Sequence, residues 1–322
     1  MEKTLDVKIR KLQSDTQCNE FILADAKDAD MAFGLAAPGQ CAQTGRSRTL
    51  AEYREWIRQV VGQGLVDITL MSASTCEILA GEESLFDESK VTPAVRWNDT
   101  TDIWLAAGTG NYSEQPSLPF RSASLNRVAR ARLGLYSITM NNHAKADRET
   151  LEAYASFRCA AEAAGIQHFL EIFPPNAPGE HAPPDVGQFL CDTIVRTLAG
   201  LTKAERPLFL KMPYVGPRLT EQLAAYDPGL IIGIMGGASG TTFDAFALLA
   251  EAKKHGVRAA LFGRRINQAE DQLAFVQHLR WLADSEIEVV EAVRSYHAAL
   301  EKQNLRPWRS LEEDLANTPA GT

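Results

Sequence analysis

The feature that most constrains the fold is a regular alternation of short apolar runs with amphipathic, helix-like segments along the whole chain. Runs rich in β-forming residues, each followed by apolar residues at helical spacing, are typical of βα units around a parallel sheet. The expected strands are Phe21–Ala26, Leu65–Leu70, Thr101–Ala106, Leu133–Met140, His168–Phe173, Leu208–Pro213, Leu230–Met235 and Val257–Phe262. Since eight such strands close on themselves, the sequence predicts an α/β fold, the (β/α)8 TIM barrel.

The extent of the barrel follows from length and from the ends of the pattern. A chain of 322 residues, 45% of them hydrophobic, lies within the range of one barrel domain. We therefore expect a single domain over residues 1–322, with an N-terminal extension over about 1–19 and a C-terminal helix and tail over about 286–322.

Charge and cysteine content exclude several partners. The net charge of −8 disfavours nucleic acid, which needs clustered Lys and Arg. Five scattered cysteines without CxxC spacing are typical of reduced thiols in a cytosol. The charged start MEKTLDVKIRKLQSD is unlike a signal peptide, and no apolar run has the length of a membrane span. We expect a cytoplasmic protein with no membrane partner.

One lysine stands out in the sixth expected strand, within PLFLKMPYVGP. Strand alternation puts Phe209, Lys211 and Pro213 on one face. If that face points into the barrel, burial lowers the pKa of the Lys211 amine and yields the neutral form that attacks a carbonyl. The alternative is a structural lysine at a strand end, paired with an acid or lying against a phosphate.

Two carboxylates occupy similar places on other strands. Asp25 and Lys27 share a face at the end of the first strand, and Glu171 lies between Phe169 and Phe173 on a face of the fifth. Asp25 and Glu171 are candidate acid–base groups, because a carboxylate in an apolar site can shuttle protons. The alternatives are an ion pair at the barrel rim for Asp25 and a loop amide partner for Glu171.

Glycine-rich loops follow the seventh and eighth strands, where this fold characteristically binds phosphate. In GIMGGASGTT, Gly236 and Gly237 let backbone N–H groups approach an anion, and Ser239 adds a hydroxyl. In LFGRRINQAEDQ, Gly263 opens the backbone and Arg264 offers a bidentate guanidinium. Two such loops on consecutive strands favour a phosphate site over two tight turns, with Lys27 as a further candidate ligand.

With these residues in place, the chain resembles the class I aldolases of the deoxyribose-phosphate, archaeal-type fructose-bisphosphate and tagatose-bisphosphate kind, most strongly over residues 169–268. That resemblance implies a (β/α)8 barrel with a Schiff-base lysine on strand six. It assigns Lys211 to the imine and Gly236, Gly237, Gly263 and Arg264 to phosphate.

The resemblance has departures in the eighth strand and elsewhere. The family pattern Gly-Arg-Asn-Ile/Val-aromatic-Gln is matched at the positions of Gly263, Arg264, Ile266 and Gln268, but Arg265 and Asn267 differ from it. The acidic residue in LEIFPPN is similar to the strand-five Glu of the tagatose-bisphosphate and sulfosugar-phosphate branch, which implies proton transfer by Glu171. The strand-four lysine of the tagatose type has no counterpart in RLGLYSITMNN, although Lys145 follows in the loop. Asp25 matches the strand-one aspartate of these relatives in position.

The sequence therefore predicts a lyase that reversibly cleaves a phosphorylated ketose or related sugar acid, with Lys211 forming the imine and no cofactor. The histidines show no HxH or HExxH spacing, so no metal site is expected. One alternative is a phosphosugar isomerase, epimerase, or decarboxylating or acyl-transferring enzyme without an imine. The other is a non-catalytic barrel that binds a sugar phosphate. We expect a homo-oligomer, since barrels of this kind commonly associate.

Overall fold

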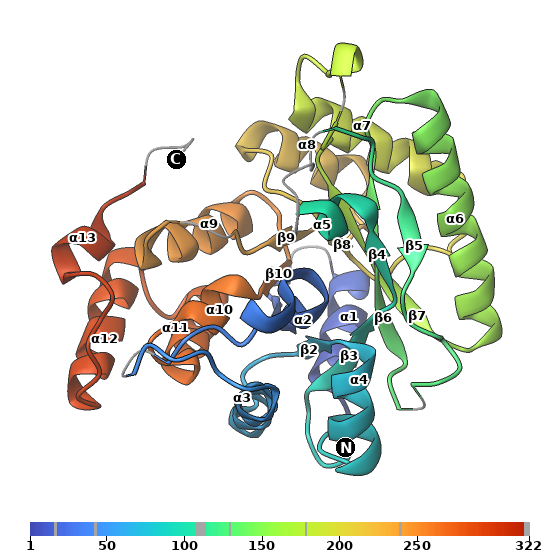
Figure 1. The fold of residues 1–322 in the computed structure, drawn as a ribbon. Helices are drawn as coiled ribbons and strands as arrows, with labels where there is room; N and C mark the ends of the chain where they lie inside the picture. The colour runs from blue at the N-terminus through green and yellow to red at the C-terminus, as the bar shows by residue number, and fades with distance from the viewer. Residues whose placement is uncertain are drawn as a thin grey trace.

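The computed structural model describes residues 1–15, 18–41, 44–106, 114–128, 130–177, 179–237 and 240–318. Eight parallel strands surround the centre of the molecule and helices cover them (Figure 1). The strands are β1 (Ile22–Lys27), β2 (Ile68–Met71), β3 (Thr92–Arg96), β6 (Leu133–Thr139), β7 (Gln167–Phe173), β8 (Leu210–Lys211), β9 (Gly233–Met235) and β10 (Ala259–Phe262). Their order is β8-β7-β6-β3-β2-β1-β10-β9, and the bridge between Met212 and Ile234 joins the two ends. The predicted (β/α)8 barrel is confirmed.

The third predicted strand was wrong. Residues Thr101–Ala106 form the helix α5, and the third strand of the barrel is β3, which pairs with β2 and β6. Two features make β3 hard to recognise as a strand from the sequence. Pro93 interrupts its apolar run, and the charged Arg96 ends it. Asp102 lies in the first turn of α5, where a carboxylate favours a helix start.

A short hairpin replaces a long helix between β3 and β6. Strands β4 (Asn98–Thr100) and β5 (Pro119–Arg121) pair antiparallel and flank α5 in the sequence. In Figure 1 the hairpin lies between the barrel and α6 (Ala144–Ala163). The hairpin thus lies beside the ends of the strands that carry the site.

Most other βα units have a conventional outer helix. These helices are α3 (Leu50–Gln63), α6, α7 (Val186–Ala199), α8 (Pro217–Tyr226), α9 (Thr242–Lys254) and α11 (Gln272–Asp284). After β2, α4 (Ala73–Cys76) continues into η2 (Glu77–Glu82). Thr49 and Glu52 form a capping box at the start of α3. The helix ends at Gln63 and is followed by Gly64 in the left-handed conformation, which favours glycine.

The apolar residues form two layers, one on each face of the barrel wall. The inner layer contains Ile22, Ala24 and Ala26 of β1, and the helix α1 (Thr4–Ser14) closes its lower end with Leu5, Ile9 and Leu12. The outer layer lies between the strands and the helices and includes Leu23 of β1. Successive residues of a strand thus belong to different layers, which decides the environment of every polar side chain at a strand end.

The C-terminal segment lies outside the barrel. Helices α12 (Val289–Lys302) and α13 (Leu311–Leu315) lie next to α9 and α11 (Figure 1). The Asp314 carboxylate accepts a 2.7 Å hydrogen bond from the Thr242 amide at the start of α9. None of the described helices has the length and apolarity needed to cross a membrane.

Replacement of Gly134 by alanine tests the packing of β6. An ideal Cβ at this position would lie 1.3 Å from Nε1 of the buried Trp97, so the indole must move. We expect Gly134→Ala to lower the free energy of unfolding by about 1–3 kcal/mol in urea titrations. The control is Gly62→Ala in α3, where a Cβ meets nothing and a small gain is expected. Equal urea midpoints for wild type and Gly134→Ala would contradict this packing.

Candidate active site

The candidate site lies inside the barrel, at the ends of β7 and β8. Phe169 and Phe209 stack in the inner layer with ring centroids 4.6 Å apart. Two residues further along each strand, Glu171 and Lys211 face each other in register, and Lys211 Nζ contacts Glu171 Oε1. The exposed fractions are only 7% for Lys211 and 2% for Glu171. The predicted lysine and carboxylate therefore meet in a nearly closed part of the barrel.

Arg96 of β3 links this pair to a second carboxylate. Its Nη2 lies 3.0 Å from Glu171 Oε2, and its Nε donates a 2.6 Å hydrogen bond to Asp28 Oδ2. Ser137 of β6 completes the cluster: its hydroxyl donates to Glu171 Oε2 at 2.6 Å and accepts from Arg96 Nη1 at 2.9 Å. Two cations and two carboxylates are thus joined in one buried network, the charge cluster of Lys211, Glu171, Arg96 and Asp28.

This network determines the protonation of Glu171. Burial by itself would raise the pKa of the carboxyl, but Lys211 and Arg96 outweigh burial and lower it to about 2. For Arg96, burial works against the charged form, and the neighbouring Asp28 and Glu171 raise its pKa above the ordinary value. Glu171 is therefore ionised, and Arg96 protonated, throughout the neutral pH range.

Asp28, Arg96 and Ser137 were not predicted as site residues. Arg96 was missed because the third strand was expected at Thr101–Ala106 and not at Thr92–Arg96. The run TPAVR holds a usable signal: its alternation puts Ala94 and Arg96 on one face, with the charge at the strand end. Asp28 follows Ala26 by two residues and so continues the inner face of β1 beyond the strand.

Asp25 and Lys27 do not join the site. The sequence correctly put them on one face, but that face points outward, because Ala24 and Ala26 belong to the inner layer. Lys27 Nζ lies 3.3 Å from Asp25 Oδ1 and also donates to Asn267 Oδ1 on an outer helix. Both side chains are fully enclosed. Burial raises the pKa of the Asp25 carboxyl and lowers that of the Lys27 amine. The prediction of a proton-transfer role for Asp25 and a ligand role for Lys27 is not supported by this placement.

The loop after β9 is glycine-rich partly for packing reasons. A Cβ at Gly236 would lie 2.2 Å from the Phe262 ring, and the Gly236 amide donates to the Leu261 carbonyl at 2.8 Å. This N–H is therefore used within the barrel wall. Gly237 adopts a left-handed conformation with φ +67°, which favours glycine. Ser239 lies outside the described residues.

The loop after β10 presents an arginine at the barrel rim. Gly263 precedes the short helix α10 (Arg264–Gln268), and a Cβ there would lie 2.8 Å from the Ala26 carbonyl oxygen of β1. The exposed Arg264 guanidinium lies 5.8 Å from the centre of the Phe33 ring. In the described part of the chain, no carboxylate lies within ion-pair distance of Arg264, so its charge is available to an anion.

Residues after β6 have mainly structural partners. Asn141 donates to Asn176 Oδ1 at 3.0 Å, which ties the loop after β6 to the loop after β7. Asn176 Oδ1 also accepts from the Ser117 amide at 3.0 Å, beside the β4–β5 hairpin. The His143 side chain caps the start of α6 by accepting from the Ala146 amide. These contacts hold the loops around the mouth of the barrel in place.

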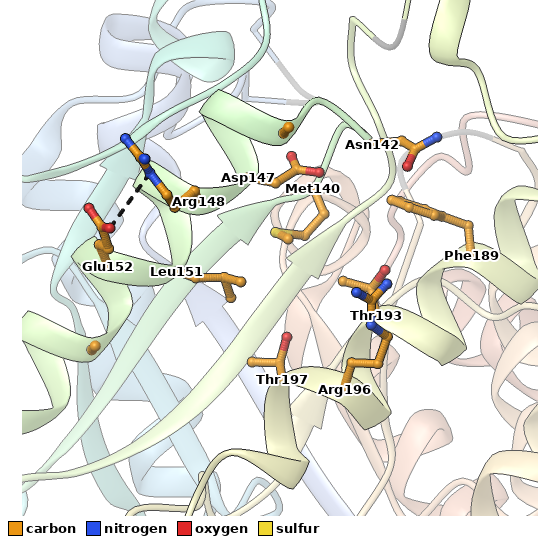
Figure 2. Close-up of a pocket in the computed structure, with 12 residues that line it drawn as sticks. Met140, Asn142, Asp147, Arg148, Leu151, Glu152, Phe189, Thr193, Arg196 and Thr197 are labelled. Carbon is orange, nitrogen blue, oxygen red and sulfur yellow. Dashed lines mark ion pairs between the residues drawn. The ribbon is translucent and has the colours of Figure 1, made fainter.

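A large groove lies elsewhere, between α6 and α7. Its volume is about 700 Å³, and it is lined by Met140, Leu151, Phe189, Thr193 and Arg196 among others. Figure 2 shows these side chains between the two helices. Every lining residue belongs to α6, α7 or the loop between β6 and α6, and none belongs to the charge cluster. Cavity size therefore does not locate the candidate site in this barrel.

Comparison with solved structures shows the fold. An archaeal fructose 1,6-bisphosphate aldolase aligns with 86% of this chain and 99% of its own, at a TM-score of 0.63 and 14% identity. A second such structure, with the catalytic Lys covalently bound to the carbinolamine intermediate, gives 0.62 and 16% over 86% and 99%. A protein from Corynebacterium glutamicum gives 0.58 and 16% over 88% and 94%. No protein-family model and no curated protein matches the chain by sequence.

Within the described residues, no three His, Cys, Asp or Glu side chains gather in a way that would hold a metal ion. A nearly enclosed amine lies against a carboxylate that is ionised at neutral pH, and an arginine holds that carboxylate from its other side.

The low pKa of Glu171 predicts acid sensitivity. Its pKa is about 2 in the fold against an ordinary 4.5, so the ionised group stabilises the fold above pH 4.5, and this stability is lost as the pH falls towards 2. The shift corresponds to roughly 3 kcal/mol. Between pH 5 and pH 3, the free energy of unfolding in urea should fall more for wild type than for Glu171→Gln, because the glutamine cannot titrate. Parallel losses in the two proteins would contradict the assignment.

Proposed function

We propose that this protein is a class I aldolase that reversibly cleaves a phosphorylated ketose or related sugar acid through a Schiff base on Lys211. The observation that carries the proposal is the contact of Lys211 Nζ with ionised Glu171 inside the barrel. The likeness in fold to archaeal fructose 1,6-bisphosphate aldolases supports it. One of these was solved with its catalytic Lys bound to a carbinolamine.

The first half of the reaction joins the substrate to Lys211. The ammonium loses a proton, the amine nitrogen attacks the substrate carbonyl, and the carbonyl oxygen becomes the hydroxyl of a carbinolamine. Protonation of that hydroxyl releases water and leaves an iminium cation. Glu171 lies against the same nitrogen, so one carboxylate stabilises a positive charge both before and after imine formation.

The second half cleaves the carbon–carbon bond. A base removes the proton from the hydroxyl on the carbon beyond the scissile bond, and the oxygen forms a carbonyl, so that this fragment leaves as an aldehyde. The electron pair of the broken carbon–carbon bond moves into the iminium to form an enamine. Protonation of the enamine carbon and hydrolysis then release the retained fragment. Glu171 is the proposed acceptor in the proton transfers, oriented by Arg96 and Ser137. The sequence suggested Asp25 as a second acid–base group. We assign that role to Asp28, which accepts a hydrogen bond from Arg96.

The anionic end of the substrate is assigned to the barrel rim. Arg264 offers a guanidinium without a carboxylate partner among the described residues, and a planar fork of donors suits a phosphate. The glycine backbone at Gly237 and Gly263 lies in the two loops beside it. Ser239 remains a candidate hydroxyl donor by sequence alone.

Borohydride trapping tests the imine directly. Sodium borohydride with dihydroxyacetone phosphate should give one covalent adduct, seen by intact mass and mapped to Lys211, because only an imine is reduced to a stable secondary amine. Folded Lys211→Met should give no adduct. Glu171→Gln should form it more slowly, by about 10²–10⁴-fold if proton transfer limits the rate.

The absence of an adduct for dihydroxyacetone phosphate and for a panel of keto acids, together with ligand-dependent thermal stabilisation, would overturn the proposal. The phosphosugar isomerase, epimerase and decarboxylase alternatives would then be tested by turnover. Stabilisation without any turnover would favour a sugar-phosphate-binding barrel.

A further inference from the structure

The rim arginine is carried by a very short helix. Helix α10 contains only the five residues from Arg264 to Gln268. A helix of this length is not stable by itself, so its position depends on side chains that attach it to the rest of the fold. The contacts of α10 therefore decide where the Arg264 guanidinium lies.

One attachment joins α10 to the outer face of β1. Lys27 Nζ donates to Asn267 Oδ1, and Asn267 Nδ2 donates to the Tyr53 hydroxyl of α3 at 3.2 Å. The backbone N–H of Asn267 in turn donates to the Gly263 carbonyl at 2.9 Å, which closes the single turn that contains Arg264. Asn267 is thus held from the side of β1 and α3 and directly shapes the turn.

A second attachment joins α10 to the loop after β9. Arg265 Nη1 donates to the Gly240 carbonyl at 2.8 Å. Arg265 and Asn267 are the two positions at which the strand-eight pattern departs from the aldolases that the sequence resembles. Both departures therefore have a structural explanation: Asn267 attaches α10 to β1, and Arg265 attaches it to the loop after β9.

Burial of the Asp25–Lys27 ion pair carries a large desolvation cost, which offsets the attraction between the two charges. Lys27 and Asp25 are both fully enclosed, and an apolar pair of similar volume would give similar or greater stability. Stability alone therefore does not account for the pair. What an apolar pair cannot supply is the pair of hydrogen bonds that Lys27 donates, one to Asn267 on α10 and one of 3.2 Å to Gln272 Oε1 on α11.

We propose that Lys27, neutralised by Asp25, is a positioning residue for the anion site: through Asn267 it fixes α10 so that Arg264 faces the anionic group of the substrate. This inference rests on the proposed function, in which Arg264 binds that group. Lys27 itself touches no substrate, in contrast to the ligand role that the sequence suggested.

The test compares a phosphorylated and an unphosphorylated ketone in the same trapping reaction. The variant Asp25→Leu/Lys27→Met removes both charges, and Asn267→Ala breaks the link while it keeps the pair. Each should raise the half-saturating concentration of dihydroxyacetone phosphate by about tenfold or more, because a small displacement of a binding group has effects of this order. The half-saturating concentration of dihydroxyacetone should not change.

Thr69→Val is the matched control. Thr69 lies opposite Asp25 in the pairing of β1 with β2 and is as completely buried, but it has no part in the link to Asn267. In this variant the half-saturating concentrations of both ketones should equal those of wild type. Urea unfolding of all variants separates positioning from stability, since the double variant is expected to be at least as stable as wild type.

Unchanged trapping of dihydroxyacetone phosphate in folded Asn267→Ala, or an equal shift for the two ketones, would overturn the inference. If the double variant does not fold, Asn267→Ala alone decides. If wild type traps neither ketone, the imine proposal fails, and calorimetry with inorganic phosphate tests the positioning role separately. Wild type should then bind phosphate more tightly than Asn267→Ala. Equal affinities, or no phosphate binding by wild type, would reject the positioning role.

Discussion

The contact of Lys211 with Glu171 is the interaction on which the rest of the site depends. Neither charge would persist in the barrel interior without the other, since an isolated buried ion is strongly unfavourable. Arg96 and Asp28 extend the pair to two cations and two carboxylates, and Ser137 donates to Glu171 Oε2, the oxygen that Arg96 also binds. Loss of any one charged member would leave the remainder unbalanced, at a cost of about 3–5 kcal/mol.

The barrel wall divides polar side chains between two different tasks. Residues that continue the inner layer, such as Glu171 above Phe169 and Lys211 above Phe209, meet at the mouth of the barrel. Residues one position away on a strand point to the helices, where Lys27 meets Asn267. The same strand β1 serves both: Asp28 belongs to the charge cluster, whereas Asp25 and Lys27 face α10 and α11. The charge cluster and the link from Lys27 to Asn267 thus lie on opposite faces of one sheet.

Much of this arrangement could be predicted from the sequence. Seven of the eight strands were found in place, because their apolar runs are long and bounded, and alternation correctly grouped Glu171 with its flanking aromatic residues. Alternation does not reveal which face is inside. The last two inward residues of β1 are the small Ala24 and Ala26, so the charged face was interpreted as the functional one. Arg96 was missed for a different reason, since Pro93 and the charge at the strand end hid β3.

In the proposed reaction Lys211 bonds to a substrate carbonyl while Arg264 binds the anionic end. A crystal structure of the protein after borohydride reduction with dihydroxyacetone phosphate tests both contacts at once. We expect continuous density from Lys211 Nζ to the former carbonyl carbon, with Glu171 beside the nitrogen and the phosphate at the Arg264 side chain. A ligand held away from Lys211, or attached to another lysine, would contradict it.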